Sequence, residues 1–588
     1  MRDAVDAEPR LFADLSTLDA SYSNFDAETF SWLLRRSGNH PLQLAVPVPL
    51  RDAAERSGML AATIEVLPRT QALCLGVIER WADYRDPLTR SYDQQWYNRG
   101  RVQYDREAWR DVSRALQEPA PRLQRLLVHS LSGEEARINA LPIDLFANHA
   151  PMLRSCSLSG VHLPLEYVPA LSTLREFVYE PPSNTLHEAD LRRIMRGMPY
   201  LETLEIEVYR YRAADPSTIT DGADVNTERL DNLRTLRLGH APTSLEQLLD
   251  FVLPLAPKLE ALVMYDDGDE LVWLTRVVKA FPFFRKLRLV NFWLEAEMAR
   301  SENGRPVTLR VFSDEDPTVF TFRNILKRLP VDHLVELVIH EHHWPEEDRG
   351  DEESDEDDTD EEDSSTTVDS NLSSEEASGT SSMPGGWDES PATSDAGSDS
   401  EVPDTTQPPV LPTVSRPPRG LPVFPELHHL HIILASTDDY LNSQDLDEDF
   451  EGVLYADGRR SLGRRMPQLE HITIEHGLRL ESPCIEYLRH VCNCNVPMPV
   501  SLRDVKTLIE DLAPATKKKP RMLQENSKRL RKVVLRGLDP VDMDEAACLR
   551  ELGELAVEVE VQEMVPPPSE GYKLEWPGDP RAIFTVWS

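Results

Sequence analysis

The sequence predicts an α/β fold in which a short unit of strand and helix repeats along the chain to form a curved solenoid. Two observations support this prediction: one apolar motif recurs twelve times, and the segments between its copies carry helical periodicity. The length agrees with growth by repetition, because 588 residues exceed the roughly 250–300 residues over which a single hydrophobic core usually grows.

The repeated motif is an apolar residue, two variable residues, a second apolar residue, one variable residue and a third apolar residue, often with proline two places before the first. The first residues of the twelve copies are Thr70, Leu123, Leu153, Leu174, Leu201, Leu233, Leu259, Phe284, Leu334, Leu427, Leu469 and Leu530. From Leu123 to Phe284 the copies are 30, 21, 27, 32, 26 and 25 residues apart. This spacing is close to the period of about 20–29 residues of leucine-rich repeats. The later steps of 50, 93, 42 and 61 residues indicate irregular repeats, with insertions, missed units or both.

Each motif is expected to form one strand of a parallel sheet. Alternate side chains of a strand face opposite sides, so Leu236 and Leu238 should point inward while Thr235 and Arg237 face outward. Leu233 would enter the interior from the preceding turn. Because a fully buried leucine contributes only ~1.5–3 kcal/mol, several rungs must stack before the array is stable.

The segments between motifs predict helices on the outside of the sheet. Apolar residues over Leu245–Val252 fall at i, i+3, i+4 and i+7, and Thr243 and Glu246 have the spacing of a capping box. Thr185 and Glu188 repeat that start signal. Similar helical patterns cover Leu271–Phe281 and Phe322–Leu329.

The net charge of −39 is unevenly distributed. The stretch Glu346–Asp404 carries −22 and the rest of the chain −17. The whole segment from Glu346 to Gly420 is rich in Asp, Glu, Ser, Thr, Pro and Gly, so it predicts a disordered acidic insert that cannot bury enough surface to fold. The expected organisation is an N-terminal cap of helix and strand (1–60), a first part of the solenoid (61–345), the insert (346–420), and a continuation with a C-terminal cap (421–588).

Composition excludes several classes of protein. No apolar run approaches the ~18–20 residues of a membrane-spanning helix, the acidic N-terminus lacks a signal-peptide pattern, and six cysteines are sparse. We therefore expect a monomer in the cytoplasm, the nucleus or both, with no membrane partner. Nucleic acid is not expected as a partner, because phosphate binding needs clustered Lys and Arg.

No catalytic motif occurs in the chain, which contains no nucleophile elbow, P-loop, GxGxxG or H-E-x-x-H sequence, so we expect neither an enzyme nor a cofactor. Cys484, His490, Cys492 and Cys494 allow a zinc interpretation. They lack paired C-x-x-C knuckles, and thiols without metal are the favoured interpretation.

Outward strand positions are the candidate partner-binding residues, because neighbouring units place them on one continuous surface. They include Glu205, Arg237, Tyr265, Lys286 and Arg288. Arg and Tyr are common anchors of protein interfaces, which favours Arg237, Tyr265 and Arg288. We also expect Arg237, Lys286 and Arg288 to form a basic strip that the acidic insert could cover.

Two further sets of residues predict regulation. Lys517, Lys518, Lys519 and Arg521 form a dense basic cluster, either a nuclear import signal or a solvated basic loop. Ser354, Ser373 and Ser398 each have an acidic residue three places on, the pattern of sites for acid-directed kinases.

The N-terminal segments Pro9–Leu15 and Phe30–Leu44, together with Leu141–Ala147, resemble the F-box-like, leucine-rich-repeat family of mushroom-forming (basidiomycete) fungi. The resemblance implies a substrate receptor of a cullin-type ubiquitin ligase, in which the F-box binds the adaptor and the repeats hold a target. Only eight residues precede Pro9, too few for an F-box, so either the true start lies upstream or this copy lacks the ligase dock.

The sequence therefore predicts a protein-protein interaction module, a ubiquitin-ligase substrate receptor or its F-box-less relative, whose protein target it does not identify. The alternative is an acidic nuclear binding protein whose insert captures basic partners such as histones.

Overall fold

The structure, a computed structural model, describes eighteen segments of the chain. They are residues 14–15, 26–49, 52–78, 99–130, 139–182, 185–208, 210–213, 230–239, 245–265, 271–290, 293–312, 325–326, 328–340, 422–434, 463–476, 498–512, 530–540 and 545–562. The predicted acidic insert lies outside them.

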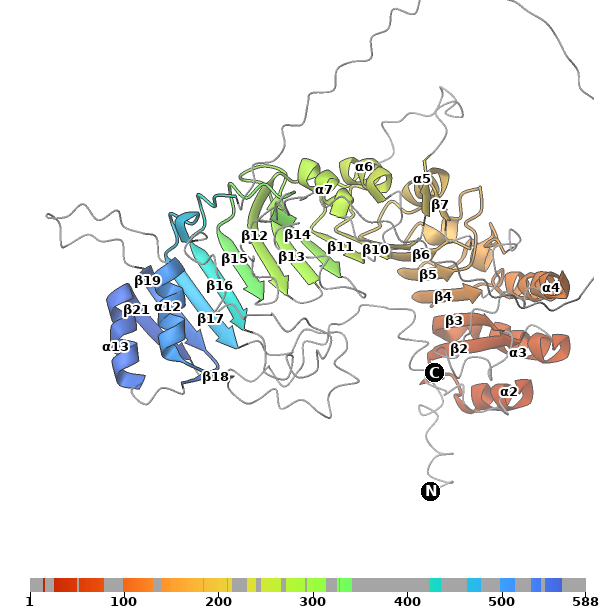
Figure 1. Ribbon diagram of the computed structural model, residues 1–588. Helices are drawn as coiled ribbons and strands as arrows, with labels where there is room; N and C mark the ends of the chain where they lie inside the picture. The colour runs from red at the N-terminus through yellow and green to blue at the C-terminus, as the bar shows by residue number, and fades with distance from the viewer. Residues whose placement is uncertain are drawn as a thin grey trace, which may run out of the picture. The chain divides into compact units, whose positions relative to one another are not determined.

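Seventeen of the described strands form one sheet (Figure 1). In the order of their pairing they are β1 (Asp14–Leu15), β2 (Leu42–Pro49), β3 (Thr70–Ile78), β4 (Arg125–Ser130), β5 (Ser155–Ser159), β6 (Glu176–Glu180), β8 (Thr203–Glu207), β10 (Thr235–Gly239), β11 (Ala261–Tyr265), β14 (Pro306–Phe312), β13 (Trp293–Ala299), β12 (Phe283–Val290), β15 (Glu336–His340), β16 (His429–Leu434), β17 (His471–His476), β19 (Leu530–Arg536) and β21 (Ala556–Gln562). Neighbours are parallel except where β13 pairs with β12 and β14. The protein is thus a mixed α/β structure with a large, mostly parallel sheet.

Helices connect many of these strands. The described α-helices are α2 (Ala27–Arg36), α3 (Ala53–Val66), α4 (Arg99–Ala115), α5 (Glu188–Gly197), α6 (Leu245–Leu255), α7 (Leu274–Ala280), α12 (Leu502–Leu512) and α13 (Glu545–Leu555). Short 3-10 turns, η2 (Leu67–Arg69), η5 (Leu145–Asn148), η6 (Pro169–Leu171) and η9 (Leu271–Trp273), occupy other connections. Among the described helices, none combines the length and apolarity needed to cross a bilayer.

Small pairs of strands lie beside the main sheet. β7 (Thr185–His187) pairs with β9 (Arg210–Arg212), and β18 (Met498–Val500) pairs with β20 (Leu538–Pro540), both in parallel.

The second and third apolar residues of all twelve motif copies lie in strands of the main sheet, so these predictions are confirmed. The second residues are in register from strand to strand, and together with their counterparts in the other strands they form one interior row. That row is Leu44, Leu73, Leu126, Cys156, Phe177, Leu204, Leu236, Leu262, Leu309, Ala296, Leu287, Leu337, Leu430, Ile472, Val533 and Val559. All of these side chains except Val559 are almost completely buried, in one cluster with the buried faces of the helices.

The turn before the strand explains why proline often occurs two places before the first apolar residue of the motif. In the turn before β4, the backbone N–H of Leu123 donates to the carbonyl of Ala120 at 3.1 Å, which places Pro121 at the second position of the turn. The fixed φ of proline suits that position. The same hydrogen bond closes the turns before Leu153, Leu174, Leu201, Leu233, Leu259, Leu334, Leu427 and Leu469.

The strands between residues 283 and 312 depart from sequential order. β12, β13 and β14 form an antiparallel meander that runs back toward β11, so that β14 lies beside β11 and β12 lies beside β15. The motif at Phe284 is therefore not the next rung after Leu259. β13 and β14 are two strands that the motif missed, and they account for part of the long step after Phe284.

The helix predictions are confirmed for Leu245–Val252 and Leu271–Phe281, which lie in α6 and in η9 with α7. The start signal at Thr185 is wrong. Thr185 belongs to β7, and α5 begins after His187, whose backbone N–H donates to Oδ2 of Asp190 at 3.3 Å. Thr243 and half of Phe322–Leu329, residues 322–324 and 327, lie outside the described residues.

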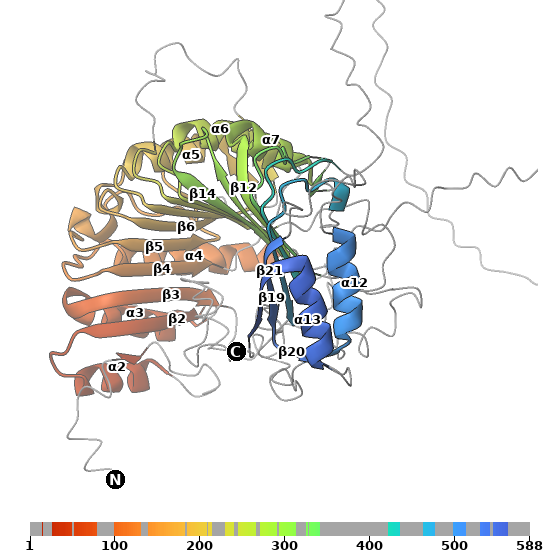
Figure 2. The same cartoon turned by 90° about the vertical axis from the view of Figure 1, so that its left-hand side faces the viewer.

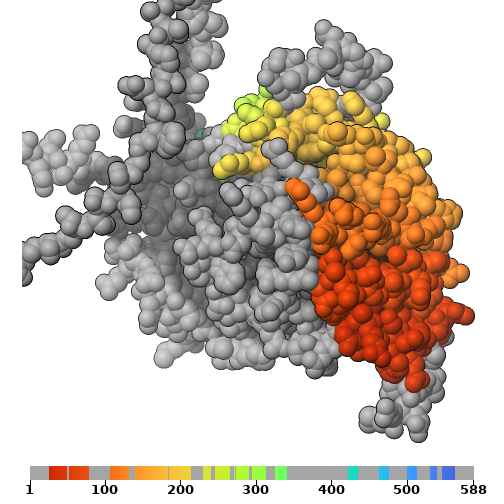
Figure 3. Space-filling view, turned by 90° about the vertical axis from the view of Figure 1, so that its right-hand side faces the viewer, coloured from red at the N-terminus to blue at the C-terminus, as the bar shows by residue number. Residues whose placement is uncertain are grey.

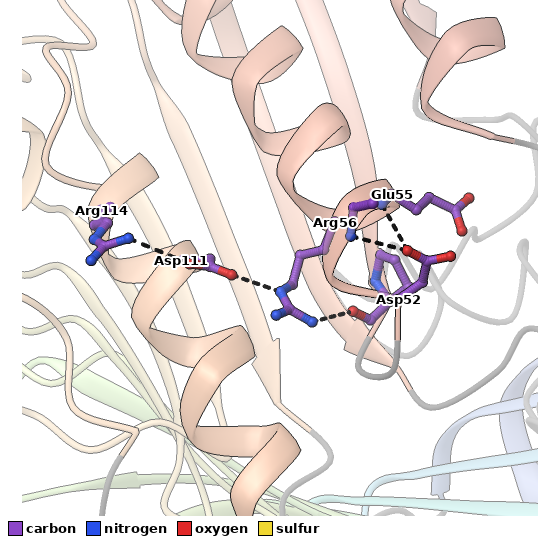
Figure 4. A network of polar contacts seen from close by, with 7 residues as sticks. Asp52, Glu55, Arg56, Asp111 and Arg114 are labelled. Atoms are coloured by element: carbon purple, nitrogen blue, oxygen red, sulfur yellow. Dashed lines mark hydrogen bonds and ion pairs between the residues drawn. The ribbon is translucent and has the colours of Figure 1, made fainter.

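The N-terminal units are joined by an arginine that is almost completely buried (Figure 4). Nε of Arg56 on α3 lies 2.8 Å from Oδ2 of Asp111 on α4, and its Nη1 donates to the carbonyl of Pro49 at the end of β2. Asp52 caps α3 by accepting from the N–H groups of Ala54 and Glu55. In Figure 3 the units from the red N-terminal part to the yellow part near residue 200 follow one another in chain order across one side of the molecule.

Candidate partner-binding face

The side chains that alternate with the interior rows make up the outward face of the sheet. Its central row is in register through sixteen strands, which run side by side in Figure 2. The row is Ala45, Cys74, Leu127, Ser157, Val178, Glu205, Arg237, Val263, Arg310, Glu295, Arg288, Val338, His431, Thr473, Val534 and Glu560. The outward face therefore offers a continuous series of positions in which polar and charged residues alternate irregularly with apolar ones.

Two of the predicted binding residues form an ion pair. Nη1 of Arg237 on β10 lies 3.2 Å from Oε2 of Glu205 on β8, and the side chains are only 19% and 13% exposed. Partial burial holds this pair in a fixed geometry more firmly than an exposed pair would be held. The pair thus fixes a guanidinium and a carboxylate beside each other on the outward face.

The other predicted residues lie elsewhere on the face. Nζ of Lys286 on β12 lies 3.1 Å from Oε2 of Glu336 on β15, and this contact raises the pKa of Lys286. Arg288 lies on β12 between Glu295 of β13 and Val338 of β15. Tyr265 is the last residue of β11, and its side chain lies outside the described side chains.

The expected basic strip does not exist. β11, β14 and β13 lie between β10 and β12, so Arg237 is about 19 Å from Arg288 by the spacing of ~4.8 Å per strand. Glu295 stands between them, and it pairs with Arg310 at 3.5 Å. The prediction failed because it assumed that strands follow one another in chain order.

A polar network that the sequence did not reveal crosses the outward face from β16 to β21. Oε2 of Glu475 lies 2.9 Å from Nη1 of Arg536 and 2.9 Å from Nε2 of His431, although the histidine contact is poorly aligned as a hydrogen bond. Nε of Arg536 donates to Gln562 at 2.8 Å, and Gln562 donates in turn to Glu560. Burial opposes ionisation of Glu475, but its two basic neighbours outweigh burial and hold its pKa below the usual value.

Two histidines stack beside this network. The rings of His429 on β16 and His471 on β17 are 4.4 Å apart and nearly parallel. Burial lowers the pKa of His471, and the neighbouring His429 adds to the effect. His429 and His431 share the outward face, as strand alternation predicts. In the segments that the structure describes, no group of three metal-binding side chains comes together.

A second polar chain links β4, β5 and β6. The hydroxyl of Ser159 donates to Oε2 of Glu180 at 2.5 Å, and Nδ1 of His129 lies 2.8 Å from the same hydroxyl. The serine stands between the imidazole and the carboxylate, so its proton is directed to Glu180. This order orients the three side chains and does not place the imidazole as a base for the hydroxyl.

Apolar residues interrupt the outward face at several positions, and at one of them two residues pack together. Val338 on β15 and Ile433 on β16 form a small buried cluster apart from the main core. The available signal was broken alternation, because Val338 precedes the interior Ile339 and Ile433 follows the interior Ile432.

Several predicted sites lie outside the described residues and remain predictions. They are the basic cluster Lys517, Lys518, Lys519 and Arg521, the serines Ser354, Ser373 and Ser398, and the zinc candidates Cys484, His490, Cys492 and Cys494. Comparison with known proteins found no family model that matches the chain and no similar curated protein.

Proposed function

We propose that this protein is a protein-protein interaction module, built as a curved, leucine-rich-repeat-like solenoid that holds its target on the outward face of the sheet. One observation carries the proposal: sixteen strands keep the outward positions in register, so that many short units present one surface. Surfaces of this kind bind extended areas of other proteins, because each unit contributes a few side chains at a fixed spacing.

The chemistry of the outward face supports recognition of a polar protein surface. Its charges are largely arranged in pairs, among them Arg237 with Glu205 and Lys286 with Glu336. Paired charges lose little conformational freedom on binding, and they penalise a partner that cannot match them. The face would therefore select a target by the pattern of its charges more than by apolar area.

Within this class, we propose a substrate-recognition subunit linked to a ubiquitin ligase. The support is the resemblance of Pro9–Leu15 and Phe30–Leu44 to F-box-like, leucine-rich-repeat proteins. Extending the chain with its upstream genomic sequence and measuring binding to the ligase adaptor tests this step. Absence of adaptor binding would leave target holding in place and remove the ligase role.

A matched pair of variants tests the outward face. Arg237→Glu breaks the pair with Glu205 on that face, whereas Arg175→Glu breaks a more exposed pair with Glu202, also at 3.2 Å, formed by the residues that directly precede β6 and β8. Both variants make the same change of charge. In affinity capture of the full chain from cells with quantitative mass spectrometry, one set of proteins should be lost with Arg237→Glu and retained with Arg175→Glu. Equal retention by the two variants would contradict the proposal.

The second candidate is capture of basic proteins, such as histones, by the acidic insert. The net charge of −22 on Glu346–Asp404 favours this second candidate. Deleting residues 346–420 separates the two candidates. The first predicts that the target is retained after the deletion, and the second predicts that it is lost together with the strong salt dependence of its binding.

A further inference from the structure

β21 forms one edge of the main sheet among the described strands. It pairs with β19 on one side, and no other described strand pairs with it. Figures 1 and 2 show it at the end of the strand series, with α12 and α13 side by side next to it. Edge strands are commonly protected by proline, charged side chains or a bulge. In β21 neither a proline nor a bulge is present, and the charged residues, Glu558 and Glu560, are both acidic.

The interior row opens to solvent at this edge. Val533 and Leu535 of β19 are 0% and 1% exposed, whereas Val561, which is paired with Leu535, is 50% exposed. Val557 is 77% exposed. Val561 thus lacks the packing that its counterparts in the preceding strands receive, whereas Val557 lies opposite Arg531, a position that is exposed in the preceding strands as well.

The backbone of the same valines faces the open side. The N–H of Gly537, which directly follows β19, donates to the carbonyl of Gln562 at 3.1 Å. In a parallel strand the N–H and C=O of one residue point to the same side and alternate along the chain. Since Gln562 points toward β19, the backbone groups of Val557, Val559 and Val561 point away from it.

The outward side of β21 is acidic. Glu558 and Glu560 are 60% and 38% exposed, and both contact the single ammonium group of Lys532. Two carboxylates share one cation, so the strand keeps an excess negative charge beside its open edge.

We propose that the β21 edge binds an extended peptide segment of another protein, in which apolar residues alternate with basic ones. The segment would add as a further strand, hydrogen-bonded to the backbone of Val557, Val559 and Val561. Its apolar side chains would cover the exposed valines, and its Lys or Arg side chains would lie opposite Glu558 and Glu560. This site lies at the edge of the sheet and shares Glu560 with the end of the outward row, but its backbone pairing does not depend on the function proposed above.

A second copy of the same strand fits this edge poorly. Two β21 strands related by a two-fold axis run antiparallel, and the valines of both must share one side. Each such register that overlaps by five residues or more places Glu558 opposite Glu560, or one of them opposite its own copy. Like charges directly opposite each other destabilise a strand pair, which favours a basic segment over self-pairing.

The test uses the full chain and a capped synthetic peptide in which four lysines alternate with four valines. A peptide with the same residues in two blocks is the control for non-specific attraction to an acidic protein. Isothermal titration calorimetry should detect the alternating peptide and give at least a roughly tenfold lower affinity for the block peptide. Amide hydrogen exchange of the unmutated chain should slow at Val557, Val559 and Val561 when the alternating peptide is bound.

Two variants at one position separate backbone pairing from charge. Val561→Pro removes the N–H that faces the open edge, a position where an edge strand tolerates proline, and should weaken the alternating peptide roughly tenfold or more. Val561→Thr keeps the N–H and should bind within about threefold of the unmutated chain. Thermal unfolding of both variants checks that they fold, and the exchange measurement stands independently of them.

Four results would overturn the proposal. They are equal binding of the two peptides, unslowed exchange at the three valines, self-association of the chain that the peptide cannot displace, and peptide binding that appears only after residues 563–588 are removed. The last result would assign the edge to the chain's own C-terminal residues.

Discussion

Arg237 on β10 contacts Glu205 on β8 at 3.2 Å on the outward face, while Leu236 and Leu204 of the same two strands are in register on the interior face. One residue step along the strand therefore separates a side chain that packs in the interior from one that lies on the outward face. This division makes it feasible to change the outward face without losing the fold.

The first prediction tests that division. Leu236→Ala should lower the free energy of unfolding by about 2–5 kcal/mol, because Leu236 is completely buried and its removal leaves a cavity. Arg237→Ala should cost about 1 kcal/mol, since it breaks one partly exposed pair. Urea unfolding followed by circular dichroism measures both. A larger loss for Arg237→Ala than for Leu236→Ala would contradict the assignment of the two faces.

The buried Arg56 and its partner Asp111 give the second prediction. Asp111→Ala should destabilise the chain by about 3 kcal/mol, because it leaves the almost fully buried guanidinium of Arg56 without this carboxylate. Replacing both residues, as in Arg56→Met with Asp111→Leu, should cost clearly less, since no buried charge is then left behind. Chemical unfolding of the two single variants and the double variant gives the coupling. Additive losses would show that the pair does not act as a unit.

The third prediction concerns Gly160 and Gly553, where substitution by Ala should change the stability of the chain in opposite directions. Gly160 has a φ of +67°, and a Cβ atom there would stand 2.0 Å from the carbonyl oxygen of Ser130. Gly160→Ala should therefore destabilise the chain by about 1–3 kcal/mol. A Cβ on Gly553, inside α13, would meet nothing within 4 Å, so Gly553→Ala should stabilise it by about 0.5–1 kcal/mol. Thermal unfolding distinguishes the two, and stabilisation by Gly160→Ala would contradict the close approach of β4 and β5.

Strand positions could be read from the sequence because paired aliphatic residues with period two mark them, as Leu236 and Leu238 do. The order in which the strands pair could not be read from the sequence. β14 carries the alternating residues Val307, Leu309 and Val311, yet nothing local to it encodes that it pairs with β11 and not with β12. A hairpin returns the chain to an earlier neighbour, and such long-range pairing is outside the reach of a spacing pattern.

For the candidate face, the sequence predicted which residues point outward but not which of them contact each other. Alternation assigned Glu205 and Arg237 to the outward side, and the structure places them there as a pair. The partner of Arg310 was not predictable, because Glu295 becomes its neighbour only through the antiparallel pairing of β13 with β14, two strands that the motif missed. Position on a face is a local property of a strand, whereas contact across a face depends on the topology of the whole sheet.

Glu475 gives the last prediction, a dependence of stability on pH. Although burial opposes its ionisation, His431 and Arg536 hold its pKa below the ordinary value of 4.5 in the folded chain. The carboxyl group of Glu475 therefore ionises more readily in the folded chain than in the unfolded chain, so its ionisation stabilises the fold. This contribution is present above pH 4.5 and is lost as the pH falls through the lower, folded value. Glu475→Gln should accordingly be less stable than the unmutated chain at pH 7, and the difference should shrink as the pH is lowered below 4.5.

Urea unfolding of the two chains at a series of pH values measures that difference, and taking the difference cancels the titration of the many other carboxylates. Glu470→Gln is the matched control, because Glu470 lies five residues earlier and pairs with Arg531, whose side chain is mostly exposed. Loss of an exposed pair should change stability by less than about 1 kcal/mol. A difference for Glu475→Gln that stays constant from pH 7 to pH 3 would show that its carboxylate is not held by Arg536 and His431, and the polar network from β16 to β21 would then lack its central link.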